Sequence, residues 1–359
     1  MKIDQKLLKT MGFALGCIII FIIIIALISS CIRNKKYTYE ELEAKLINLS
    51  KNYYDSNKES LPKDGENTSL KTEYFITNGN LKHLTLTTGE TCFGEIIVSN
   101  SNGYYLYSPI LTCGDIKTIN LTDKLKEDVT TTGEGLYNYG SSYIYRGENI
   151  NNYLLIGEGL YRIIKINHND EIRIIENKRS ESTSWDNRYN IDKNSNEGIN
   201  DFISNNINSR IKSKLEESYD GDKFTDEEKA YFVKQDLCIG KRSIKDNVDD
   251  GSIECSATIE NQMFGLITVN EYLQASLDAN CLNITSPSCT NYNYLAKLES
   301  STWTLTADKD TSYKAYRLDY SISLTNTSNS SGVAIVAHLN KNTLYQSGTG
   351  TLNDPYIIK

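Results

Sequence analysis

The strongest constraint on this chain is an uninterrupted apolar stretch close to its start. Residues 11–28 contain no charged residue and no proline. As an α-helix rising about 1.5 Å per residue, the stretch reaches most of the way across a hydrocarbon core of about 30 Å. The rest of the chain is polar and rich in tyrosine, so we expect it to lie on one side of a membrane, behind a membrane-associated segment at residues 1–36.

Two interpretations of the apolar stretch stay open. In the first it is an uncleaved, single-pass transmembrane helix, and its N-terminal lysines stay cytoplasmic as the positive-inside rule prefers. In the second it is the apolar region of a cleaved signal peptide. Residues 28–31 (Ile-Ser-Ser-Cys) resemble the bacterial lipobox, which makes Cys31 a candidate lipidated N-terminus. We favour the uncleaved helix, and both interpretations leave the later domains outside the bacterial cell membrane.

The net charge and the cysteine pattern limit which binding partners and which cellular compartment can be expected. Acidic residues number 46 against 38 basic ones, for a formal net charge of -8; nucleic-acid binding needs a basic surface, so no nucleic-acid partner is expected. The cysteines and histidines lack the spacing of a metal site, and no cofactor is expected. Six of the eight cysteines form close pairs, which predicts disulfides in an oxidising compartment. The pairs are Cys92 with Cys113, Cys238 with Cys255, and Cys281 with Cys289.

The pair Cys92 and Cys113 also follows from a hairpin register. Asn102-Gly103 is a preferred type I′ turn, and apolar runs flank it. With these two residues in the loop, the two cysteines are directly opposed in a non-hydrogen-bonded pair, with Cα atoms about 4.5 Å apart. This spacing lies within the range of a disulfide. Pro109 occupies another non-hydrogen-bonded site, where its missing N–H costs the hairpin nothing.

The hairpin belongs to a predicted small α+β domain at residues 37–122. Thr38 and Glu41 have the spacing of a capping box, which predicts a helix from about Tyr39 to Ser56. A second short helix is predicted over 70–77. The polar stretch 123–142 reads as a linker.

Residues 143–359 are predicted to form a larger α+β domain. Strands come first, helices follow, and strands return at the end. The first four strands are expected to form an antiparallel meander, and helical spacing covers 199–215. Capping boxes at Thr225–Glu228 and Thr268–Glu271 open two further helices. The predicted strands are 143–146, 153–156, 160–166, 172–176, 303–306, 314–318, 320–324 and 333–339.

Residues from about 143 to 359 resemble a bacterial extracytoplasmic domain family of unknown function, related to the C-type-lectin or formylglycine-generating-enzyme fold. Ala334 and Ile335 stand where the family usually has Arg-Pro, so any binding role of that arginine is lost or moved. The resemblance implies a lectin-like fold. It is carried by 153–156, 160–164, 264–272 (Phe-Gly-Leu-Ile-Thr-Val-Asn-Glu-Tyr), 303–306 (Trp-Thr-Leu-Thr), 332–336 (Gly-Val-Ala-Ile-Val), 347–351 and 355–356.

The N-terminal part is similar to the pilin-like half of such proteins. Residues 12–15 (Gly-Phe-Ala-Leu) look like the start of type IV pilins and pseudopilins. Those proteins carry a glutamate where this chain has Cys17, and they continue the helix where Thr38 begins a new one. Both differences count against assembly into a pilus.

No catalytic constellation stands out. His168 in a predicted turn and His338 in a predicted strand are better explained as structural residues. The acidic segment 246–251 lacks the pattern of a calcium loop. Trp185 follows a polar run and is the best candidate for stacking on a sugar.

The leading hypothesis is therefore a membrane-anchored bacterial surface protein that binds a glycan or a surface protein and performs no chemistry. In this hypothesis the chain contacts membrane lipid through residues 11–28. The alternative is a pseudopilin-like subunit of a secretion or pilus system. A third hypothesis, an enzyme on the formylglycine-enzyme-like fold, requires free cysteines, whereas all six outer cysteines can pair.

Overall fold

The computed structural model describes residues 20–21, 36–179, 181–188 and 198–359. In these residues the chain is α+β, with mostly strands and six α-helices. Contacts divide the chain into two compact units. Of the described residues, those within 1–60, 69–97 and 109–118 belong to unit 1, and those within 61–68, 98–108 and 119–359 belong to unit 2.

No helix in the described part of the chain is long and apolar enough to cross a membrane. The predicted anchor, residues 11–28, lies outside that part except for Ile20 and Phe21. Residues 12–15, Cys17 and Cys31 lie outside it too. The anchor and the lipidation of Cys31 therefore stay predictions.

The β2–β3 hairpin forms as the sequence predicts. Strands β2 (Cys92–Ser101) and β3 (Tyr104–Cys113) have equal length and leave two residues for the turn. Asn102 and Gly103 have φ of 53° and 87°, as a type I′ turn requires. The Cys92–Cys113 disulfide joins Cα atoms that lie 4.1 Å apart, which confirms the pairing and its register.

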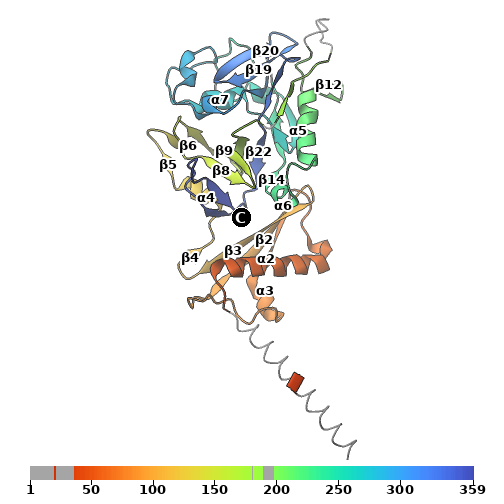
Figure 1. Cartoon of the computed structure of the whole chain (residues 1–359), viewed down its shortest axis with the longest axis vertical. Helices are drawn as coiled ribbons and strands as arrows, with labels where there is room; N and C mark the ends of the chain where they lie inside the picture. Colours follow the sequence, from red (N-terminus) through yellow and green to blue (C-terminus); the bar gives the residue numbers. More distant parts are fainter. Residues whose placement is uncertain (1–19, 22–35, 180, 189–197) are drawn as a thin grey trace, which may run out of the picture. The chain divides into compact units, whose positions relative to one another are not determined.

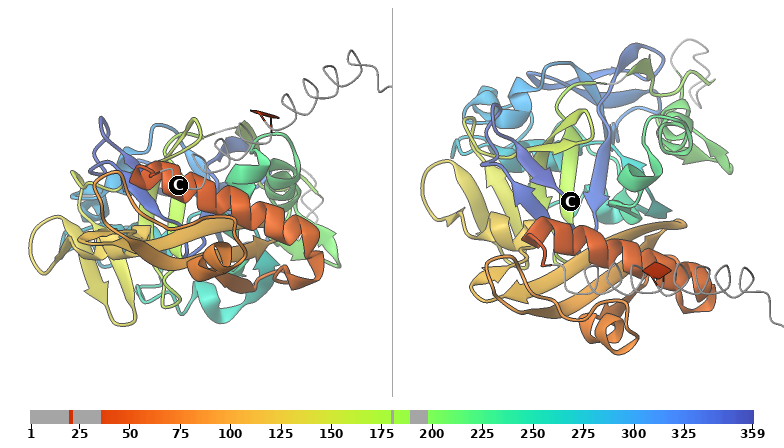
Figure 2. Two further views of the ribbon diagram at one scale, coloured as in Figure 1. Left: turned by 90° about the horizontal axis from the view of Figure 1, so that it is seen from below. Right: turned by 60° about the horizontal axis from the view of Figure 1, so that its bottom comes forward.

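Helix α2 (Tyr39–Ser56) has the predicted bounds. Thr38 Oγ1 accepts from the Glu41 amide, and Glu41 Oε2 accepts from the Thr38 amide, both at 3.1 Å. Leu42 and Leu46 are fully buried, and the Tyr39 hydroxyl lies 3.5 Å from the Leu111 carbonyl of β3. Figures 1 and 2 show α2 running along the hairpin.

Short elements complete this part of the chain. The helix predicted over 70–77 is shorter, α3 (Thr72–Thr77), because the residues before it form strand β1. Strands β1 (Asn67–Lys71) and β4 (Ile116–Lys117) extend the hairpin to a four-stranded sheet of order β1-β2-β3-β4. A 3₁₀ turn, η1, spans Lys58–Ser60.

An eleven-stranded sheet forms the main part of unit 2. Its principal path has the order β14-β22-β10-β9-β7-β6-β5, and β8, β17, β23 and β24 join it from the side. Its strands are β5 (Val129–Thr130), β6 (Gly135–Tyr139), β7 (Ser142–Arg146), β8 (Tyr153–Ile156), β9 (Gly159–Ile166), β10 (Ile172–Glu176), β14 (Phe232–Val233), β17 (Phe264–Gly265), β22 (Val336–Leu339), β23 (Tyr345–Ser347) and β24 (Tyr356–Ile358).

The structure corrects two predictions around this sheet. The stretch 123–142 is not a linker, because helix α4 (Leu121–Lys126) and strands β5 and β6 lie in it. Leu121 and Leu125 are fully buried, so an apolar helical face was hidden among the polar residues. The expected simple meander is also wrong: β7 and β8 pair with opposite ends of the longer strand β9.

The helix predicted over 199–215 is confirmed only in its last part. Helix α5 spans Arg210–Asp220, with Ser209 as its N-cap. The preceding residues form a hairpin of β12 (Ile203–Ser204) and β13 (Ile207–Asn208). Asn205 and Asn206 have φ of 50° and 61°, the left-handed conformation that asparagine tolerates in a two-residue turn. This local turn chemistry overrides the helical spacing of the isoleucines.

A second sheet in unit 2 has five strands in the order β11-β21-β18-β19-β20. The strand predicted over 333–339 is broken because the Ala334 amide donates to Thr302 Oγ1 and the Ile335 amide donates to Glu176 Oε2, each at 2.9 Å. The strands are β11 (Glu181–Ser184), β18 (Thr302–Ala307), β19 (Lys314–Asp319), β20 (Ser321–Asn326) and β21 (Ser330–Val333).

The remaining elements of unit 2 are short. The capping boxes predicted at Thr225 and Thr268 are both formed, and they begin helices α6 (Asp226–Lys229) and α7 (Val269–Ala275). A two-stranded sheet joins β15 and β16. The other elements are β15 (Gln235–Cys238), β16 (Thr258–Gln262) and the 3₁₀ turns η2 (Glu254–Ser256), η3 (Pro287–Thr290) and η4 (Tyr294–Lys297).

The three predicted disulfides are all present, and they fit an oxidising, extracytoplasmic compartment.

The Cys92–Cys113 bond spans 21 positions, so replacing both cysteines by serine should lower the free energy of unfolding by about 3 kcal/mol in the chain-entropy model. The Cys281–Cys289 bond spans 8 positions, and the same double replacement there should cost about 2.5 kcal/mol. Denaturant unfolding of both variants checks the values and their order; unchanged stability of the Cys92/Cys113 variant would contradict the assignment.

Candidate functional site

Three basic side chains lie side by side on one face of the large sheet. Arg173 on β10 pairs with Lys165 on β9 and with His338 on β22. Directly opposed residues on neighbouring antiparallel strands have Cβ atoms about 4.5–5.5 Å apart, and like charges placed there destabilise the sheet. This basic row therefore requires a counter-ion and at least one neutral member.

Glu271, in the first turn of α7, is the counter-ion. Its Oε1 lies 2.5 Å from Arg173 Nε and 3.3 Å from Lys165 Nζ, and its Oε2 accepts from Arg173 Nη2 at 3.2 Å. Thr268 holds the same carboxylate in the capping box of the helix. The Glu271 side chain is only 4% exposed, so this is a buried ion pair.

The electrostatics of Glu271 follow from this geometry. Burial alone raises the pKa of a carboxyl group, but here the charges of Arg173 and Lys165 outweigh burial and hold the pKa of Glu271 at about 2. The unfolded chain has the ordinary value near 4.5. The stability gained from this shift is therefore complete above pH 4.5 and is lost as the pH falls from 4.5 towards 2.

His338 is the neutral member of the basic row. Burial, together with the charges of Arg173 and Lys165, holds the pKa of His338 well below its ordinary value. Its Nε2 lies 3.5 Å from Arg173 Nη1; because a guanidinium only donates, Nε2 is the acceptor and the proton belongs on Nδ1. That nitrogen lies 4.0 Å from Glu171 Oε2.

A cavity of about 250 Å³ opens above the basic row. Lys165, Arg173, His338 and Glu271 line one side of it, and the loop closed by the Cys238–Cys255 disulfide lines another. We call it the polar cavity. Its surface is rich in planar polar groups, which also include Asp236, Asp250, Asn270, Gln274 and Glu254.

A second buried ion pair fixes the loop wall of the polar cavity. Arg242 and Glu254 are both almost fully buried, and Glu254 Oε1 and Oε2 accept from Arg242 at 2.9 and 3.1 Å. Arg242 also donates to the Val248 carbonyl within the loop. Glu254 Oε1 accepts from the Asn270 amide at 3.1 Å, so the loop and the start of α7 are tied together.

Asn270 is one of three residues lining the cavity that have a buried atom without a hydrogen-bond partner among the described residues; the others are Arg173, at Nε, and His338, at Nδ1. Asn270 is 7% exposed, and no group among the described residues donates to its Oδ1. A buried carbonyl oxygen left without a donor costs about 1–3 kcal/mol. A ligand that presents a hydroxyl or amine hydrogen to Asn270 would recover this cost.

An exposed aromatic side chain stands at the rim of the polar cavity. Tyr139, the last residue of β6, lines the cavity and is 49% exposed. An aromatic ring beside a set of hydrogen-bonding groups offers a ligand one apolar face and several polar contacts. The arrangement suits a small ligand with a ring and many hydroxyl groups.

Trp185, predicted to be an exposed stacking residue, is fully buried. Its Nε1 donates to the Thr304 carbonyl at 3.2 Å, and its own carbonyl accepts from the Ile211 amide. The prediction was wrong because the polar run before Trp185 forms the edge strand β11, which carries the indole into the core. Tyr139 provides the exposed ring instead.

Lys165 and Arg173 were missed by sequence reasoning, although a signal existed, and His338 was interpreted only as a structural residue of a strand. Lys165 and Arg173 each interrupt a run of isoleucines inside a predicted strand. A charged side chain in such a position is buried only when it is paired, so each of these two cations indicates a partner of opposite charge. Glu271 was recognised as a capping residue, but its second role depends on where the helix meets the sheet.

Comparison of the chain with models of known protein families, with curated proteins and with solved structures found no significant match.

The neutral state of His338 predicts a pH dependence of stability. Folding lowers the pKa of His338 below its ordinary value of 6.5, so in this range the unfolded chain binds a proton that the folded chain does not. Stability should be complete above pH 6.5 and fall by up to about 1.4 kcal/mol per pH unit below it. His338→Gln should reduce this loss, whereas His168→Gln, in an exposed turn, should not. Denaturant unfolding between pH 7.5 and 5 measures both; equal slopes in all three proteins would contradict the assignment.

Proposed function

We propose that this chain is a carbohydrate-binding protein of the bacterial cell surface and that the polar cavity holds one sugar residue. The observation that carries the proposal is the buried amide oxygen of Asn270, which lacks a donor among the described residues. A sugar hydroxyl can supply one.

The size of the polar cavity favours a single sugar ring. Its volume of about 250 Å³ is below the 300–1,000 Å³ that is typical of sites for drug-sized ligands. A longer glycan would place its other residues outside the cavity, where Tyr139 offers an exposed ring.

The chemistry of the lining supports the same ligand class. Hydroxyl groups both donate and accept, and the cavity offers carboxylate oxygens, amides and the Lys165 ammonium group within one small space. Two buried ion pairs, Arg173–Glu271 and Arg242–Glu254, fix the walls before a ligand enters. Such preorganisation lowers the entropic cost of binding.

The location outside the membrane is part of the proposal. The apolar stretch at 11–28, as a transmembrane helix or as a signal segment ending at Cys31, would hold the two units on the outer side. The resemblance of residues 143–359 to a lectin-like family agrees with sugar binding. The new helix that starts at Thr38 argues against a pilus subunit.

A glycan array probed with the full chain tests the proposal. We expect the protein to bind a defined set of glycans and Asn270→Ala to bind the same set about fivefold more weakly, as loss of one hydrogen bond worth about 1 kcal/mol predicts. Asn329→Ala changes an exposed residue that does not line the cavity and serves as the matched control. No binding to any glycan, or equal affinities of the two variants, would contradict the proposal.

A further inference from the structure

Strand β20 is the open edge of the five-stranded sheet. It is the last strand in the sheet order, and β19 is its only partner in the described part of the chain. Proteins usually protect such an edge with a charge, a proline or a bulge. β20 (Ser-Ile-Ser-Leu-Thr-Asn) has no charge and no proline, and its register with β19 runs without a shift.

A groove of about 260 Å³ runs along this edge. Four successive residues of β20, Ser321–Leu324, line it. Successive side chains of a strand point to opposite faces of a sheet, so a space that contacts four in a row reaches the strand edge. The groove also contacts Tyr316 of β19 and Tyr272 of α7, so it extends from the edge over one face of the sheet. The unpaired backbone N–H and C=O groups of β20 therefore face this groove.

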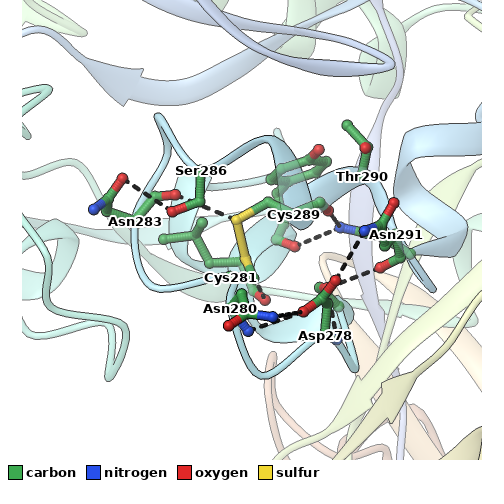
Figure 3. Close-up of a disulfide and its surroundings, with 12 residues drawn as sticks. Asp278, Asn280, Cys281, Asn283, Ser286, Cys289, Thr290 and Asn291 are labelled. Carbon is green, nitrogen blue, oxygen red and sulfur yellow. Dashed lines mark hydrogen bonds between the residues drawn. A yellow bond between two sulfur atoms is a disulfide. The ribbon is translucent and has the colours of Figure 1, made fainter.

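Another part of the groove wall is the loop closed by the Cys281–Cys289 disulfide, which contributes Ile284 and Ser286 to the lining. Figure 3 shows hydrogen bonds of side chains within the loop and next to it. Asn283 Oδ1 accepts from the Thr285 amide and from Ser286 Oγ, and Asp278 accepts from Asn280 and Asn291. The disulfide and these hydrogen bonds therefore constrain the wall without any partner.

We propose that this strand-edge groove binds a single extended, uncharged segment of a partner polypeptide, which adds a sixth strand to the sheet. The edge of β20 supplies backbone hydrogen bonds that only another extended backbone satisfies as a set. None of the described residues that line the groove is charged, so a charged segment would lose its hydration without compensation.

The two walls decide between a peptide and a second copy of this chain. A second copy would bring its own β20 with the rest of its sheet and its own disulfide loop behind it. The 281–289 loop of this chain already lines the same groove as β20, so we expect a single strand to enter it more readily than a whole sheet edge. The residue just before β20, Tyr320, bounds the edge. Its side chain is 73% exposed and its φ is 59°, and its carbonyl accepts a hydrogen bond from the Tyr272 hydroxyl at 3.1 Å.

The test uses the full chain and an array of uncharged hexapeptides with β-branched or aromatic residues at alternate positions. We expect some of them to bind and to slow hydrogen exchange of the amides of Ser321–Leu324. For the best binder, two versions methylated on the odd or the even amides are compared. Backbone pairing with β20 predicts that one version loses binding and the other keeps it.

A charge variant tests the same groove from the protein side. Ser321→Lys adds a charge at an exposed position opposite Asp319, where we expect the fold to be kept, and should weaken peptide binding by about tenfold or more. Asn329→Lys, in the exposed turn after β20 and outside the groove, should bind as the unchanged protein does.

Three outcomes would overturn the proposal. The first is that no hexapeptide binds. The second is that both methylated versions bind equally or that Ser321→Lys has no effect. The third is a dimer of the chain that Ser321→Lys abolishes, which would identify a second copy as the occupant. The sugar-binding proposal concerns the polar cavity, and its glycan array gives an independent result.

Discussion

The structure of unit 2 depends on one buried electrostatic constraint. Strand pairing places Lys165, Arg173 and His338 in a row on one face of the large sheet, and a row of three cations there would be unfavourable. The chain resolves this conflict with Glu271, which is ionised and nearly inaccessible to water, and with a His338 that stays neutral. The first turn of α7 must therefore dock on this part of the sheet and on no other. In this way one carboxylate links the register of three strands to the position of a helix.

The same constraint produces the polar cavity. Buried charges have to remain paired, so the side chains around them cannot close into an apolar core, and planar polar groups are left around a small space. The Arg242–Glu254 pair repeats this principle on the loop side and connects the Cys238–Cys255 loop to Asn270. A site with walls held in this way loses little conformational freedom when a ligand binds. In the proposed site, Asn270 has an oxygen that lacks a donor among the described residues and that a ligand hydroxyl would satisfy.

The sequence predicted those elements whose structure depends on residues close together in the chain, such as turns and helix caps. The Asn102-Gly103 turn determined the hairpin register and the Cys92–Cys113 bond, and three capping boxes located the starts of α2, α6 and α7. The failures lie where longer-range packing decides. Helix α4 was hidden in a polar stretch because only Leu121 and Leu125 reveal its buried face, and Trp185 was placed at the surface because its burial under α5 depends on the edge strand β11. The cavity depends on residues that are distant in sequence, so its location could not be predicted, although the isolated charges at Lys165 and Arg173 were a visible signal.

A double-mutant cycle between Arg173 and Glu271 tests the central claim most directly. The free energy of unfolding is measured in denaturant at pH 7, with the disulfides intact, for Arg173→Met, Glu271→Gln and the double variant. Each single variant removes the Arg173–Glu271 pair and leaves one of its two charges buried, with Lys165 still 3.3 Å from Glu271 when Arg173 is replaced, and we expect a cost of about 3 kcal/mol. The account predicts that the double variant loses about 2 kcal/mol less than the two single losses combined, because it removes both charges together. Losses that simply add would show that the two side chains do not depend on each other and would contradict the account.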